Sequence, residues 1–175
     1  MATDTIYGLV GSALKKKTVE RIYNLRRRNR KKPLIILISS IKDLNLFDVK
    51  LNRFQERFLK KIWPGKVSVI LPCPYKKFIY LHRGSEALAF RLPKKKSLVN
   101  LLKATGPLVI PSANPEGLPP AENISQAKKY FKNRPNFYLN SGSLKSLPST
   151  VIKIGKSEIE IVRQGAVKVS PNLSF

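Results

Sequence analysis

Residues 109–117 read Val-Ile-Pro-Ser-Ala-Asn-Pro-Glu-Gly, and they place hydroxyl and amide side chains directly after a short apolar run. The apolar run, at 107–110, has the composition of a buried strand, and the prolines and glycine that follow end it. Ligands of open α/β sheets bind at strand ends. Ser112 and Asn114 are therefore candidate ligand contacts, although a turn in which these side chains satisfy the local backbone would use the same residues.

The segments on both sides of this stretch alternate between helical and strand-like patterns. The last strands follow one another without helices between them, which favours antiparallel additions to the sheet. The sequence predicts an α/β fold: one domain over 1–175 with a twisted, mixed parallel and antiparallel sheet flanked by helices. Helices are expected at 18–28 behind a Thr18 N-cap, 51–62, 98–102 and 124–131, and strands at 34–38, 67–71, 87–92, 107–110, 137–140, 150–154 and 158–162.

The composition is strongly basic. The 175 residues include 34 Lys and Arg against 10 Asp and Glu, a formal net charge of +24. Such a charge favours a polyanionic partner, a nucleotide or a nucleic acid, although solubility or a basic proteome would also account for it. No apolar run reaches the about 18 to 20 residues that cross a bilayer, so no membrane role is expected.

Several familiar chemistries are excluded. The single cysteine, Cys73, allows no intrachain disulfide and no multi-cysteine zinc site, and it is expected to be a loop thiol in a reducing cytoplasm. Gly-Lys-Ser at 155–157 resembles the end of a phosphate-binding P-loop, but Thr150 stands where that motif needs glycine. The one histidine, His82, has no partner for a catalytic triad or a metal site and is expected at the surface or in a loop.

Six short polar motifs remain, most of them at the ends of apolar runs. They are TDTIYG at 3–8, RRRNRKKP at 26–33, FRLP at 90–93, PSAN at 111–114, PST at 148–150 and RQG at 163–165. In this order and spacing they resemble the YrdC-like family of threonylcarbamoyl-AMP synthases, and the resemblance extends from Thr3 to about Val167.

The resemblance implies an enzyme, a nucleotidyltransferase. L-threonine and bicarbonate would form a carbamate, which would attack the α-phosphate of ATP to give threonylcarbamoyl-AMP and pyrophosphate. ATP would be a substrate, with Mg²⁺ carried on its phosphates and no metal held by the protein. A tRNA threonylcarbamoyl-transfer complex would then modify tRNA. Adenylyl transfer needs positioned reactants and positive groups around the phosphates, not a covalent nucleophile, so basic and hydroxyl motifs are suited to it.

The resemblance also assigns the nucleotide contacts. Arg28 and Lys32 would be the catalytic residues that hold the triphosphate. Arg26 stands where the family usually has lysine, so the charge is kept while its geometry becomes a planar fork. A solvated helix end without a ligand is the alternative for 26–32. The expected ATP contacts are Arg26, Arg28, Lys32, Ser112, Asn114 and Arg163.

Thr5, Arg91 and Ser149 match positions that surround threonine in the family, where a guanidinium can pair with a carboxylate through two hydrogen bonds. Arg91 lies within an apolar strand, and a buried arginine without an anion is costly, so a ligand role is expected for it. For Thr5 an ordinary strand-end hydroxyl is equally compatible. Tyr7 is expected to pack and also to line the pocket.

The sequence also departs from the family pattern. Leu37 replaces a usual histidine, Pro120 stands where serine or threonine is frequent, and Gln164 replaces a proline. The family has a helix and a strand before the motif at 3–8, so an upstream segment is expected to be missing from this chain.

Two alternatives to the synthase are considered. Hydrogenase-maturation carbamoyltransferases carry a similar module, but within a much longer chain with zinc-finger and acylphosphatase parts. A non-catalytic protein of the same fold that binds double-stranded RNA or tRNA would also fit the charge of +24.

Overall fold

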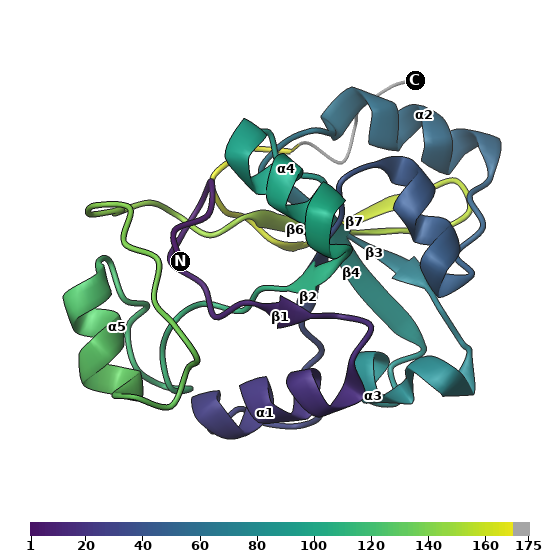
Figure 1. Ribbon diagram of the computed structural model, residues 1–175. Coiled ribbons are helices and arrows are strands. Elements are labelled where there is room, and N and C mark those ends of the chain that lie inside the picture. The colour runs from purple at the N-terminus through teal and green to yellow at the C-terminus, as the bar shows by residue number, and fades with distance from the viewer. Residues whose placement is uncertain (170–175) are drawn as a thin grey trace.

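An open sheet of seven strands organises residues 1–169, the part of the chain that the computed structural model describes (Figure 1). The strand order is β1-β5-β2-β4-β3-β6-β7. Neighbours β2 and β4, and β3 and β6, are parallel, and the other pairs are antiparallel, which confirms the predicted mixed α/β sheet. The strands are β1 (Gly11–Ser12), β2 (Ile35–Leu37), β3 (Val67–Pro72), β4 (Ala87–Arg91), β5 (Leu108–Val109), β6 (Thr150–Ile154) and β7 (Ile159–Arg163).

The four predicted helices are present, with shifted ends. The first begins two residues early, behind Lys15, so Thr18 is not its N-cap. It ends at Arg26 because Arg27 adopts the left-handed conformation (φ 50°), and the basic residues after Arg27 form a loop. The helices are α1 (Lys16–Arg26), α2 (Arg53–Ile62), α3 (Ile79–His82), α4 (Lys96–Thr105) and α5 (Ile124–Phe131), with 3₁₀ turns η1 (Ile41–Phe47) and η2 (Lys76–Phe78).

One face of the sheet is covered along most of its width. Inward residues such as Ile36, Val69, Phe90 and Ile152 alternate along their strands and pack with side chains from α1, η1, α2 and α3. Each fully buried side chain of this kind contributes about 1.5–3 kcal/mol to stability. Phe90 also meets Phe47 edge to face, with ring centroids 5.1 Å apart.

The other face is covered only in part. Leu98 and Leu102 of α4 pack against Leu37, Leu108 and Ile110 at the β2–β5 end. On this face, the alternate residues of β4 are the small side chains of Ala87 and Ala89, and both are only half-buried. This face is therefore open over β4, β3 and β6.

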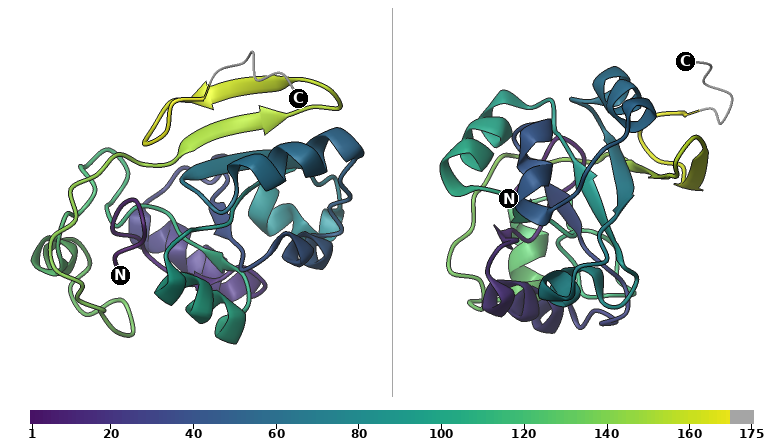
Figure 2. Two further views of the ribbon diagram at one scale, coloured as in Figure 1. Left: turned by 90° about the horizontal axis from the view of Figure 1, so that it is seen from above. Right: turned by 90° about the vertical axis from the view of Figure 1, so that its right-hand side faces the viewer.

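A second, smaller cluster joins α5 to the N-terminal segment. Tyr7 is fully buried in it, among Leu25, Ala113 and Phe131. Its hydroxyl donates to the Gly142 carbonyl at 2.5 Å and so holds the segment between α5 and β6 against the N-terminal segment. Figure 2 shows α5 at one end of the molecule, and it shows the β6–β7 hairpin along one side of the molecule.

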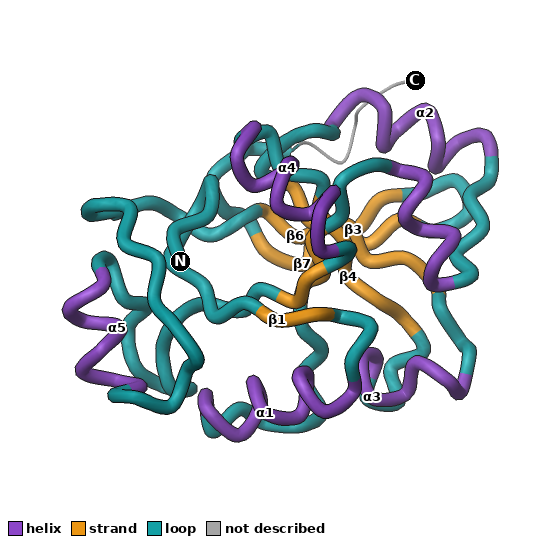
Figure 3. The backbone as a smooth tube through the Cα atoms, in the orientation of Figure 1, coloured by secondary structure: helices purple, strands orange, loops and turns teal. Residues whose placement is uncertain are grey.

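Three expectations from the sequence are wrong. Residues 137–140 form a loop, not a strand (Figure 3). Phe137 is 73% exposed there, and Tyr138 packs against the α5 cluster, so this segment joins no strand of the sheet. His82 is buried at the end of α3, because its ring accepts from the Gly84 amide at 3.1 Å and faces the Tyr75 carbonyl at 3.3 Å. Thr18 lies within α1, as noted above.

Cys73 lies in a loop as expected and is fully buried. Its thiol donates to the Phe47 carbonyl at 3.5 Å, and burial raises its pKa. In the described part of the chain, none of the helices has the length and apolarity needed to cross a membrane.

Candidate functional site

A cavity of about 820 Å³ lies on the open face of the sheet. Alternate residues of the central strands form its floor, including Ala87, Ala89 and Arg91 of β4. Its walls come from loops that the sequence motifs supply. Five cations line it and no carboxylate does so among residues 1–169; they are Arg26, Arg28, Arg91, Lys153 and Arg163.

The cavity brings together most of the residues that the sequence singled out. Lys32 and Asn114 are outside the cavity lining. The ligand roles of all nine predicted ATP and threonine contacts stay predictions. The other seven, which do line it, are Thr5, Arg26, Arg28, Arg91, Ser112, Ser149 and Arg163.

Two glycines allow the motifs to approach one another closely. A Cβ on Gly8 would lie 2.4 Å from Cγ2 of Ile110, so only glycine lets the 3–8 motif lie beside the PSAN segment. An isolated bridge between Gly8 and Ser112 marks this contact. A Cβ on Gly165 would lie 2.3 Å from the Pro148 carbonyl oxygen, so the RQG turn packs directly on the PST motif.

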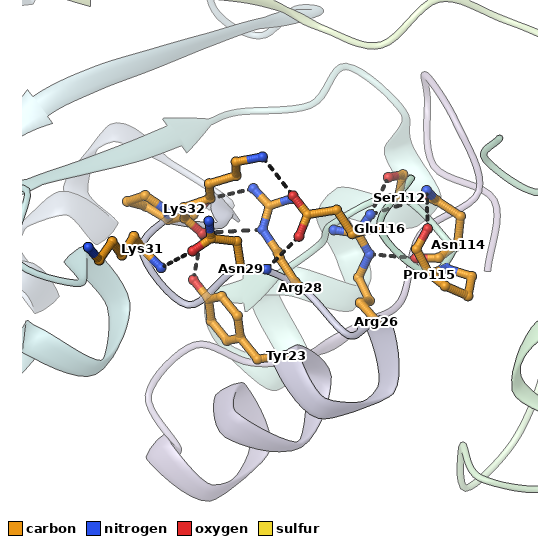
Figure 4. A network of polar contacts seen from close by, with 11 residues as sticks. Tyr23, Arg26, Arg28, Asn29, Lys31, Lys32, Ser112, Asn114, Pro115 and Glu116 are labelled. Atoms are coloured by element: carbon orange, nitrogen blue, oxygen red, sulfur yellow. Dashed lines mark hydrogen bonds and ion pairs between the residues drawn. The ribbon is translucent and has the colours of Figure 1, made fainter. Parts of the chain in front are cut away.

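Arg26 locks the PSAN loop to the end of α1 (Figure 4). It is 3% exposed; its Nε donates to the Asn114 carbonyl at 2.9 Å, and its Nη2 donates to Ser112 Oγ at 3.0 Å. Burial, and to a smaller extent the charge of Arg28, lowers the pKa of Arg26 to about 10. Its head group therefore positions the nucleotide contacts expected from the sequence.

The Asn114 side chain is hydrogen-bonded to Arg26 and to the turn that contains it. Its amide nitrogen donates to the carbonyls of Pro115 (2.9 Å) and Leu118 (2.6 Å), and its Oδ1 accepts from Arg26 at 3.2 Å. The side chain thus satisfies the turn that follows β5, which is the alternative that the sequence left open for it.

Arg28 and Arg163 reach the cavity from opposite ends of the chain. Arg28 donates to the carbonyls of Lys32 and Pro33 at 3.2 and 3.1 Å, and Arg163 donates to the Ser149 carbonyl at 2.8 Å. Burial, followed by the charge of Arg28, lowers the pKa of Arg163. Because the charge of Arg28 disfavours the charged forms of both Arg26 and Arg163, an anion beside Arg28 would be stabilised.

The Lys32 side chain lies outside the cavity lining and pairs with Glu116. Its Nζ lies 2.7 Å from Oε1 of Glu116, and the other carboxylate oxygen accepts from the Asn29 amide (Figure 4). The hydrogen bond from Lys32, followed by that from Asn29, lowers the pKa of Glu116. Glu116 was not predicted as a site residue, although it is the one acidic residue of the 109–117 stretch.

Arg91 has an anion from its own chain. The side chains of Arg91 and Asp4 are 4% and 8% exposed, and Nη1 of Arg91 lies 2.9 Å from Oδ1 of Asp4 and donates to Thr5 Oγ1 at 3.3 Å. Burial lowers the pKa of Arg91, and Asp4 opposes that shift. Within residues 1–169, Arg91 Nε and both Asp4 oxygens lack a hydrogen-bond partner. Asp4 is a second residue that the sequence analysis missed.

Ser149 completes this side of the cavity. It is 5% exposed, and its hydroxyl lies 2.8 Å from that of Ser68 on β3.

Gln164, which replaces the family's proline, donates to the Val169 carbonyl at 3.0 Å. In the described range 1–169, no group of three or more His, Cys, Asp and Glu residues is placed to hold a metal ion.

Comparison with known proteins gives a consistent result. The Sua5/YciO/YrdC family model, described as telomere recombination, matches residues 1–165. The threonylcarbamoyl-AMP synthase of Hahella chejuensis is 31% identical over 138 residues, 78% of this chain and 75% of that protein. The threonylcarbamoyl-AMP synthase of Pyrococcus abyssi is 27% identical over 167 residues, 94% of this chain but 49% of that protein, so the chain spans about half its length.

Solved structures agree on the fold. The crystal structure of Pyrococcus abyssi Sua5 complexed with L-threonine superposes with a TM-score of 0.85 at 27% identity, covering 93% of this chain and 48% of the other. Escherichia coli YciO superposes with a TM-score of 0.84 at 23% identity, covering 98% and 84%, and supports the fold alone.

Proposed function

Because this chain belongs to the Sua5/YciO/YrdC family, we propose that it makes threonylcarbamoyl-AMP and pyrophosphate from L-threonine, bicarbonate and ATP. One observation carries the proposal: residues from six separated motifs line one cavity of about 820 Å³ that has five cations and no carboxylate in its lining, within the described chain. Enzyme pockets for small ligands have volumes of about 300–1,000 Å³, so the size fits a nucleotide with an amino acid.

The proposed reaction has two steps. The threonine amino nitrogen attacks the carbon of bicarbonate, and water leaves to give the carbamate. A carbamate oxygen then attacks the α-phosphorus of ATP, and the bond to the β-phosphate breaks, releasing pyrophosphate. Both steps require that the reactants are held together, and neither requires a covalent bond to the protein.

Arg26, Arg28 and Arg163 would stabilise the charge that develops on the departing pyrophosphate. They have no ion pair to a carboxylate among residues 1–169, so their charge is available to a ligand. Ser112 would contact the nucleotide from the strand end, where Arg26 fixes its hydroxyl. In this proposal, Mg²⁺ enters on the ATP phosphates.

Thr5, Arg91 and Ser149 would bind threonine. Asp4 lies 2.9 Å from Nη1 of Arg91, so the amino acid's carboxylate would share this guanidinium with Asp4. The threonine complex of the Pyrococcus abyssi relative supports this substrate.

Pyrophosphate release tests the proposal. Purified protein with ATP and bicarbonate should release pyrophosphate only when L-threonine is added. Arg28→Ala and Ser112→Ala should each lower the rate by about 100- to 1,000-fold, because each removes one stabilising donor. Arg57→Ala on the exposed side of α2 is the matched control and should leave the rate unchanged. A folded protein that shows no threonine-dependent release would refute the proposal.

RNA binding without catalysis is a second candidate, favoured by the net charge of +24. Affinity for tRNA would then fall steeply with salt and respond to bulk charge. Ser112→Ala separates the two: a synthase loses activity and keeps RNA affinity, whereas a binder has no threonine-dependent activity to lose.

A further inference from the structure

The loop after α1 and the loop after β5 are held together by one carboxylate, that of Glu116. The backbone amide of Glu116 donates to the Arg26 carbonyl at 2.7 Å, which fixes the side chain's starting point. Its two oxygens then take the Lys32 ammonium at 2.7 Å and the Asn29 amide (Figure 4).

This arrangement resembles an occupied anion site. An ammonium and a backbone amide that converge on the oxygens of one anionic group are what a loop offers to a phosphate. Lys32, expected from the sequence to hold the triphosphate, lies outside the cavity lining and points to Glu116. The Glu116 carboxylate therefore occupies donors that a phosphate would otherwise use.

The rest of the loop does not depend on the Lys32 side chain. The Lys32 carbonyl accepts from the Tyr23 hydroxyl at 2.8 Å and from Arg28 Nε at 3.2 Å, and the Pro33 carbonyl also accepts from Arg28. The Lys32 side chain is 58% exposed. It can leave Glu116 by rotating its own torsions while the loop backbone stays in place.

We propose that Glu116 is an internal competitor of ATP for Lys32 and thereby lowers the affinity of the site for the triphosphate. An exposed ion pair is weak, so a triphosphate of higher charge displaces it. This inference rests on the proposed function, because it takes ATP as the ligand. It makes Glu116 a positioning residue, which acts through Lys32.

A purely structural role predicts the opposite sign. If Glu116 only anchors the 28–33 loop, its loss loosens the loop and weakens ATP binding. If it competes, its loss frees Lys32 and strengthens ATP binding. Glu116→Gln distinguishes these cases, because it keeps the shape and the hydrogen bond from Asn29 while it removes the charge.

Calorimetric titration of ATP in the absence of threonine measures this without turnover. Glu116→Gln should bind ATP about two- to five-fold more tightly than the unsubstituted protein, the range expected from an exposed ion pair. Lys32→Met should weaken binding, and adding Glu116→Gln to Lys32→Met should restore little, because the competition is lost. AMP, which lacks the β- and γ-phosphates, should show a smaller gain.

Glu20→Gln is the matched control. Glu20 pairs with Arg30 in the same basic loop and with Arg83, but it has no contact with Lys32. Its loss therefore tests loop anchoring without competition, and ATP affinity should not rise. Thermal midpoints for all variants show that each is folded.

Three results would overturn the inference. Unchanged or weaker ATP binding by Glu116→Gln would show that Glu116 is an anchor. An equal gain in the Lys32→Met background would show general charge repulsion that does not act through Lys32. A folded, unsubstituted protein that binds no ATP would overturn the proposed function and this inference with it.

Discussion

Asp4→Asn isolates the buried ion pair that Arg91, on the cavity floor, forms with Asp4. The substitution keeps the side chain's shape but leaves Arg91, 4% exposed, without its counter-charge. Among residues 1–169, its guanidinium would keep the hydrogen bond to Thr5 Oγ1 at 3.3 Å. Removing one partner of a buried pair costs about 3–5 kcal/mol, and the open cavity beside Arg91 places this case near the lower end, at about 3 kcal/mol.

The loss is measured by urea unfolding and by the thermal midpoint. For a chain of this size, about 3 kcal/mol corresponds to a midpoint lower by about 6–12 °C. Asp48→Asn is the control, because Asp48 and its partner Lys77 are 41% and 60% exposed. An exposed pair contributes at most about 1 kcal/mol.

A double variant separates charge burial from packing. Replacing Arg91 with methionine in the Asp4→Asn background removes the unpaired charge, so part of the lost stability should return. An Asp4→Asn protein as stable as Asp48→Asn would refute the reasoning, since it would show that Arg91 is adequately solvated from the cavity.

Two further predictions concern the cavity rim and the core. Gly165→Ala should lower the free energy of unfolding by about 1–3 kcal/mol and slow threonine-dependent pyrophosphate release, because its Cβ would lie 2.3 Å from the Pro148 oxygen; an unfolding curve that does not move would contradict this. Cys73 is fully buried with a raised pKa, so a thiol reagent at neutral pH should modify it only as the protein unfolds; immediate stoichiometric labelling of folded protein would be inconsistent with that burial.

Much of the fold follows from periodicity. The helices and most strands have apolar spacings long enough to identify, and the run of late strands correctly predicted the antiparallel β6–β7 pair. β1 could not be found, because two residues, Gly11 and Ser12, carry no pattern and pair only through β5. Residues 137–140 had a strand's composition, but Tyr138 packs against the α5 cluster, and a local pattern does not reveal that tertiary contact.

The sequence motifs that line the cavity were predictable, but the ion pairs that their residues form were not. Ser112 was found because a hydroxyl residue follows an apolar run, and Arg28 was assigned from the resemblance of its motif to the family. Glu116 and Asp4 were missed because the importance of a carboxylate depends on which cation the fold brings to it, across 84 residues for Lys32. His82 was misplaced for a different reason: its partners are the nearby backbone groups of Tyr75 and Gly84, which no side-chain motif marks.

These pairs divide the cations of the site into two classes. Arg91 and Lys32 already have carboxylate partners, whereas the other cations have none among the described residues; these are Arg26, Arg28, Lys153 and Arg163. In the proposed reaction, the first class would contribute direction and selectivity, because a ligand must compete with or complement an existing pair. The second class would contribute net attraction, since the charge of Arg28 disfavours the charged forms of Arg26 and Arg163 until an anion offsets it. A ligand with several adjacent negative charges would offset that repulsion at more than one arginine, so we expect a triphosphate to be stabilised here more than a single carboxylate.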